Sequence, residues 1–70
     1  MRYAIYFFEG YDYAPTFEKA LEVARLHVKA HYKQTESLGE SFAFIFDKLN
    51  HYRWIMFKVS NGETRYKQVY

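Results

Sequence analysis

The sequence predicts a small α+β protein in which one helix packs on a four-stranded sheet. Two observations predict this class. Four short segments are rich in aromatic and β-branched residues, and one longer segment repeats its apolar residues with the period of a helix. In chain order they read strand, helix, strand, strand, strand (βαβββ), which indicates a two-layer sandwich with a mixed or antiparallel sheet.

The length and composition bound how such a fold can be stabilised. The chain has 70 residues, so we expect a single domain over residues 1–70. A chain of this size buries only about 60% of its unfolded surface, and its core is marginal. It has no cysteine, which excludes disulfides and thiolate metal sites. Aromatic packing or oligomerisation must therefore supply stability, and the aromatic fraction of 23% suits both.

The charge and hydropathy indicate a soluble protein. The net charge is +2 with a pI near 8.9, which is far less basic than a dedicated nucleic-acid binder. No apolar run approaches the ~20 residues that cross a bilayer, and the first residues lead into a strand-like segment and not a secretory signal. We therefore expect a cytoplasmic protein with no membrane partner.

The first half of the chain predicts a strand, a loop and the helix. Arg2–Phe8 favours β structure, and Glu9–Pro15 reads as a loop whose two tyrosines pack over the sheet edge. Thr16 is a suitable N-cap, since its hydroxyl can accept a hydrogen bond from a free amide of the first turn. The helical period then runs over Phe17–Lys33, with Glu18 near the positive end of the helix dipole.

The second half predicts three strands. They cover Ser41–Phe46, Tyr52–Val59 and Glu63–Val69, and the polar alternation of the last one is typical of a sheet edge. The sequence leaves open whether the first strand lies at an edge or between later strands.

The register of the first of these hairpins has two solutions. A three-residue loop over Lys48–Asn50, with Asn50 in the left-handed region, pairs Phe46 with Tyr52. A four-residue loop shifts the pairing by one residue and inverts the faces.

The second hairpin predicts which face the helix covers. A two-residue Asn61-Gly62 turn pairs Phe57 with Tyr66, and this face is the better candidate for the helix side. One helix covers one face of a small sheet, so large aromatic residues remain on the other face in either register. We expect a partner to contact that face, with Trp54 as the anchor. The predicted partner-binding residues are Trp54, Tyr52, Met56, Lys58, Arg65 and Lys67.

Other chemistry finds little support in the sequence. His27 and His31 are spaced so that both could bind one metal ion with His51, but no acidic residue accompanies them as in zinc proteases. No nucleophile elbow or phosphate-binding glycine loop is present. We therefore expect neither an enzyme nor a metal or cofactor site.

The sequence leaves two function classes. The favoured one is a small non-enzymatic interaction or regulatory protein that forms a homodimer, or docks on and inhibits a partner protein, through the aromatic face. The alternative is a single-stranded nucleic-acid-binding module, because aromatic rings beside lysine and arginine can stack bases and hold phosphates.

Overall fold

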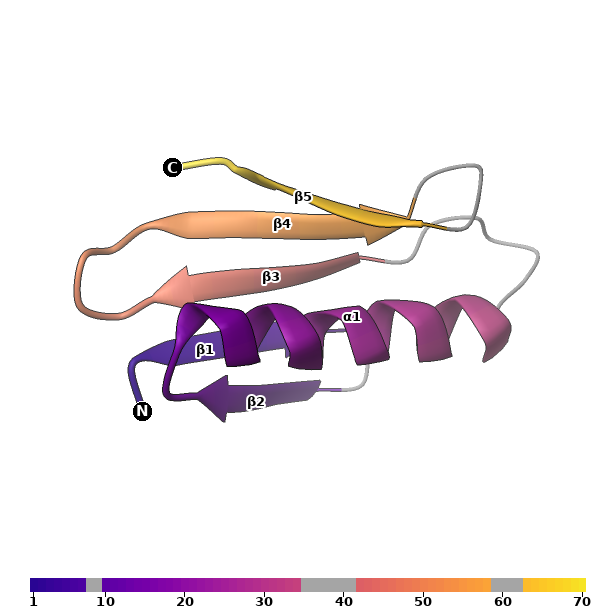
Figure 1. Ribbon diagram of the computed structural model, residues 1–70, viewed down its shortest axis with the longest axis horizontal. Helices are drawn as coiled ribbons and strands as arrows, with labels where there is room; N and C mark the ends of the chain where they lie inside the picture. Colours follow the sequence, from indigo (N-terminus) through magenta and orange to yellow (C-terminus); the bar gives the residue numbers. More distant parts are fainter. Residues whose placement is uncertain (8–9, 35–41, 59–62) are drawn as a thin grey trace.

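The computed structural model describes residues 1–7, 10–34, 42–58 and 63–70. Its elements are β1 (Tyr3–Phe7), β2 (Gly10–Ala14), α1 (Phe17–Gln34), β3 (Phe42–Asp47), β4 (Arg53–Lys58) and β5 (Thr64–Gln68). The strands form one five-stranded sheet in the order β2-β1-β3-β4-β5, and each neighbouring pair is antiparallel. The helix packs on one side of this sheet (Figure 1). The α+β class and the helix on an antiparallel sheet are confirmed.

The strand count and order differ from the prediction. Gly10–Ala14 lies in the segment that we expected to be a loop, yet it forms an edge strand paired with β1. Its tyrosines favour β structure and Pro15 ends it, so the segment behaves as a short strand despite its glycine and aspartate. The element order is therefore ββαβββ. The new strand moves β1 into the interior of the sheet, and β5 lies at the opposite edge, as its polar alternation predicted.

The helix begins where the sequence indicates. The hydroxyl of Thr16 accepts a hydrogen bond from the Lys19 amide at 3.2 Å, which confirms the N-cap. Ala20, Ala24 and Val28 form the buried stripe of α1. The sheet meets this stripe with two alanines and with larger apolar side chains, and together they form the buried core: Ala14, Ala43, Tyr3, Ile5, Ile45 and Met56.

An aromatic cluster joins the N-terminal end of α1 to the sheet. The Phe17 ring lies 4.6 Å from the Trp54 ring, 5.8 Å from Tyr3 and 5.9 Å from Tyr66, measured between centroids. Contacts of this kind add about 0.5–1.5 kcal/mol per pair beyond the area that they bury. The first residue of the helix is therefore fixed against three strands.

The β3–β4 hairpin has the four-residue loop. Phe46 pairs with Arg53, and the Asp47 amide donates to the Tyr52 carbonyl at 2.8 Å. His51 has a φ of 62°, so the left-handed position is His51, and not Asn50 as in the three-residue alternative. Because the pairing is shifted by one residue from the three-residue alternative, Trp54 and Met56 lie under the helix.

The predicted β4–β5 register was also wrong by one residue. Tyr66 pairs with Met56, and not with Phe57. The Asn61-Gly62 turn on which that register rested lies outside the described residues. Tyr66 lies on the helix side in both registers, but the slip of one residue exchanges the faces of β4, so Met56 lies beside it and Phe57 faces away.

Asp47 stabilises this hairpin and ties it to the start of β1. Its side chain is buried and receives two hydrogen bonds from the Arg2 guanidinium, at 3.0 and 2.9 Å. It also accepts the amides of Leu49 and Asn50. The hydrogen bonds from Arg2, followed by those from the two amides, outweigh desolvation and lower the pKa of Asp47 from 3.8 to about 2.

We predict that Asp47→Asn destabilises the protein at neutral pH and has little effect in acid. A carboxyl whose pKa is lower in the folded state stabilises that state fully above its unfolded pKa of about 3.8, and loses this contribution as the pH falls through about 2. Thermal melts of the natural protein and of Asp47→Asn, recorded from pH 7 to pH 2, should give melting temperatures that converge at the acid end. Glu22→Gln, which removes an exposed carboxylate, is the control. A pH-independent difference between Asp47→Asn and the natural protein would contradict this account.

Candidate interaction surface

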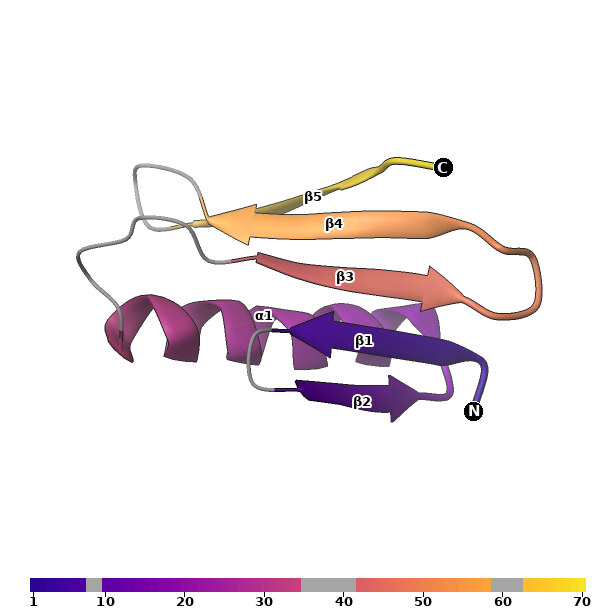
Figure 2. The ribbon, with the colours of Figure 1, turned by 180° about the vertical axis from the view of Figure 1, so that it is seen from behind.

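The face of the sheet opposite α1 is uncovered by any described element (Figure 2). We call it the outer face, and define it by the alternate strand residues that do not point toward the helix. Those residues are Ala4, Tyr6, Tyr11, Tyr13, Phe42, Phe44, Phe46, Arg53, Ile55, Phe57, Arg65 and Lys67.

The central strand β3 supplies the middle of the outer face. Its sequence alternates Phe42, Phe44 and Phe46 with residues that are buried toward the helix. Phe42 and Phe44 are 48% and 41% exposed, although each is large and fully apolar. Full burial of a side chain of this kind is worth roughly 1.5–3 kcal/mol. Each phenylalanine loses a share of that free energy in proportion to its exposure. The largest apolar residues of β3 therefore lie on a surface that no described element of this chain covers.

Cross-strand pairing aligns these residues into a row. Tyr11 pairs with Tyr6, Tyr6 with Phe44, Phe44 with Ile55, and Ile55 with Lys67. The row crosses all five strands and begins with Tyr11 at the β2 edge, followed by Tyr6 on β1. It ends on a cation at the β5 edge.

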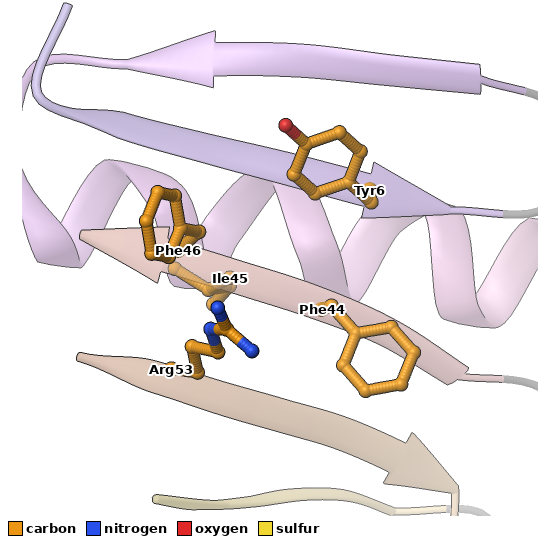
Figure 3. Close-up of a pocket in the computed structure, with 5 residues that line it drawn as sticks. All are labelled: Tyr6, Phe44, Ile45, Phe46 and Arg53. Carbon is orange, nitrogen blue, oxygen red and sulfur yellow. The ribbon is translucent and has the colours of Figure 1, made fainter. Parts of the chain in front are cut away.

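A shallow hollow of about 380 Å³ lies on this face, between β1, β3 and β4 (Figure 3). Tyr6, Phe44, Phe46 and Arg53 line it, together with Ile45. For comparison, an engineered cavity of about 150 Å³ holds benzene. The hollow is therefore wide enough for one aromatic side chain or base.

The charge of the outer face has one sign. Among its described positions, Arg53, Arg65 and Lys67 are cationic and none is acidic. The Arg53 guanidinium lies 5.5 Å from the Phe46 ring centroid and 5.7 Å from that of Tyr70. Contacts of this kind attract the cation electrostatically to both rings, so this charge is held close to the sheet.

The structure separates the residues that the sequence grouped as one site. Met56 is fully buried and Trp54 is half-buried, both against the helix, and half-buried Lys58 shares their side of β4. Arg65 and Lys67 are exposed on the outer face. Tyr52 precedes β4 and its ring lies 6.1 Å from Trp54. The wrong β4–β5 register explains the error, because it placed Phe57 and not Met56 on the helix side of β4.

The aromatic residues that dominate the outer face were not among the predicted partner-binding residues. Phe42, Phe44 and Phe46 were read only as a strand that is apolar on both sides. The tyrosines of β2 were read as a loop that covers the sheet edge. The available signal was the size difference along β3, where phenylalanine alternates with alanine, isoleucine and aspartate. Small residues suit a closely packed helix, and this alternation could have selected the faces without a register.

The histidines are not brought together in the described part of the chain. The His27 ring stacks on Phe7 at 3.5 Å, toward the end of β1, whereas His51 lies beside Phe46 in the β3–β4 loop. The side chain of His31 lies outside the described residues. In the portion that is described, no group of three histidine, cysteine or acidic residues could hold a metal ion.

Comparison with known proteins adds no relative. No protein-family model, curated protein or solved structure matches this chain. Within the described ranges, no helix has the length and hydropathy needed to cross a bilayer. The function must be argued from the outer face itself.

We predict that Trp54 and Phe44 have opposite roles. Trp54→Ala removes a ring packed against Phe17 and should lower the free energy of unfolding by about 2–4 kcal/mol. Phe44→Ser changes an exposed position and should cost about 1 kcal/mol or less in the monomer.

Urea unfolding followed by far-UV circular dichroism at low protein concentration measures both values, and it does not depend on tryptophan fluorescence. Tyr52→Ala, at an exposed neighbour of Trp54, is the control and should resemble Phe44→Ser. A small effect of Trp54→Ala would contradict its place under the helix.

Proposed function

We propose that this protein is a small non-enzymatic interaction module that self-associates, or docks on a partner protein, through the outer face. The observation that carries the proposal is the continuous aromatic surface across β2, β1, β3 and β4, with phenylalanines about half exposed at its centre. Interfaces are rich in aromatic and arginine residues at their core, and large exposed apolar patches commonly mark contact sites. A regulatory or inhibitory effect would follow when the face occupies a partner's surface.

The setting that we propose is the cytoplasm. A chain without cysteine needs no oxidising compartment to fold. Neither a cofactor nor a metal ion enters the proposal, because binding through this face requires no chemical step.

Solution mass tests the proposal. Sedimentation over a wide concentration range should give a reversible dimer, and Phe44→Ser should weaken it roughly 30-fold, which corresponds to about 2 kcal/mol at an interface hot spot. Leu26→Ser is the matched control, because Leu26 is an exposed apolar residue on the helix, at 65%. A natural protein that stays monomeric throughout would overturn self-association. If Phe44→Ser and Leu26→Ser weakened the dimer equally, the outer face would not be the site of self-association.

The second candidate is binding of single-stranded nucleic acid on the same face. It is favoured by one observation, the three outer-face cations without a described acidic position among them. Bases could stack on the tyrosine and phenylalanine rings while phosphates contact the cations.

The salt dependence separates the two candidates. Three phosphate contacts would make the logarithm of the affinity for an oligothymidine fall with the logarithm of salt at a slope of about −2. An apolar protein interface should change little over the same range. We predict no such oligonucleotide binding, measured by fluorescence polarisation from 50 to 500 mM salt. Tight binding with the steep slope, flattened by Arg65→Glu, would favour the nucleic-acid reading.

A further inference from the structure

The two edges of the outer face carry complementary groups. At the β2 edge are Tyr11 and Tyr13, and at the β5 edge are Arg65 and Lys67. Tyr11 is 62% exposed, and its neighbour Tyr13 already accepts a cation within this chain, since the Lys48 ammonium lies 4.8 Å from its ring centroid. On the outer face β2 presents these two tyrosines and no charged residue, because its Asp12 pairs with Ile5 on the helix side, whereas β5 presents two cations and no acidic residue.

From this asymmetry we infer that the occupant of the outer face is a second copy of this chain, related by a two-fold axis that runs parallel to the strands along β3. The inference rests on the proposed function and specifies its partner. Rotation about this axis exchanges left and right across the sheet. It therefore places β2 over β5 of the partner copy, β1 over β4, and β3 over itself.

The central row of side chains fits this operation. Phe44 meets the same residue of the second copy, Tyr6 meets Ile55, and Tyr11 meets Lys67. Apolar groups thus face apolar groups at the centre, and each edge sets a cation against a tyrosine ring. In the neighbouring row Ala4, the smallest residue of the face, lies opposite Arg53, the largest cation near the centre. Packed sheets cross at about 30°, so the match is closest near the axis.

Charge selects this axis over the other two-fold arrangement of the same faces. An axis across the strands would place β5 over β5 and bring Lys67 against Lys67 of the second copy. Like charges at an interface oppose association and are a common source of specificity. Of these two axes, the one along the strands sets Lys67 of each copy against Tyr11 of the other.

The outer face also offers a recess close to the proposed axis, in the hollow between β1, β3 and β4. The hollow beside Phe44 and Phe46 would receive a ring from the second copy.

A charge exchange between residues 11 and 67 tests the arrangement. Lys67→Glu removes two cation–ring contacts per dimer and should weaken dimerisation roughly 5- to 30-fold. Tyr11→Lys should weaken it too, because two lysines then meet at each edge. The double variant Tyr11→Lys/Lys67→Glu should recover to within about 3-fold of the natural dimer, since opposite charges then face each other at both edges.

An ion pair between residues 11 and 67 of the same copy cannot account for recovery in the double variant, because the two positions are too far apart. The two residues lie on opposite edge strands, four inter-strand spacings or roughly 19 Å apart. The axis across the strands predicts the reverse result, because it would oppose lysine to lysine and glutamate to glutamate in the double variant. Lys29→Glu on the exposed side of α1 is the charge-matched control and should leave the dimer unchanged.

Sedimentation of these variants, with circular dichroism to confirm folding, distinguishes failure of the proposed axis from failure of the proposed function. A double variant no tighter than the weaker single variant would overturn the axis, while a natural dimer that depends on Phe44 would keep the proposed function. A natural protein that is monomeric would overturn this inference, and with it self-association. Salt-sensitive binding of an oligothymidine by that monomer would assign the outer face to nucleic acid.

Discussion

The carboxylate of Asp47 is the constraint on which the rest of the structure depends. It ends β3, is buried, and binds both the Arg2 guanidinium and two amides of the following loop. By bonding to the loop it favours the four-residue connection, which fixes how β4 pairs with β3. By bonding to Arg2 it fixes the start of β1 beside the end of β3, where the Lys48 amide also donates to the Arg2 carbonyl. One buried acid therefore sets the register of the three central strands.

This register decides what each face of the sheet is made of. The helix side receives Ala43, Ile45 and Met56, which are fully buried with the apolar stripe of α1. The outer side receives the three phenylalanines of β3 and the exposed tyrosines of β1 and β2. The aromatic cluster around Phe17 then closes the helix side at the N-terminal end of α1, where the half-buried Trp54 is placed. The sheet therefore has a packed core on one face and an exposed aromatic surface on the other.

Much of the fold, and less of the candidate site, could be predicted from residue patterns. The period of the helix and the hydroxyl of Thr16 located α1, because both are local features of consecutive residues. The surplus apolar face followed from a count of faces and needed no register. To identify the residues of that face, however, the strand register was needed. Trp54 was chosen as the anchor because a lone tryptophan is a common hot spot, but its burial depends on whether a loop has three residues or four. The edge strand β2 was missed because five residues with glycine and aspartate have weak local preference, and the pairing with β1 supplies what that preference lacks.

The sequence by itself determined that this protein has one amphipathic helix, strands that are apolar on both sides, and more aromatic residues than one helix can cover. These are properties of composition and of short-range periodicity, which each segment carries wherever it lies in the fold. Only the tertiary structure decided which aromatic residues are core and which are surface. The alternation of a strand has two equivalent phases, and hydrophobicity alone does not distinguish them when both faces are apolar. The choice is made by contacts between distant segments, above all by Asp47 with Arg2 and by the core residues that pack under the helix.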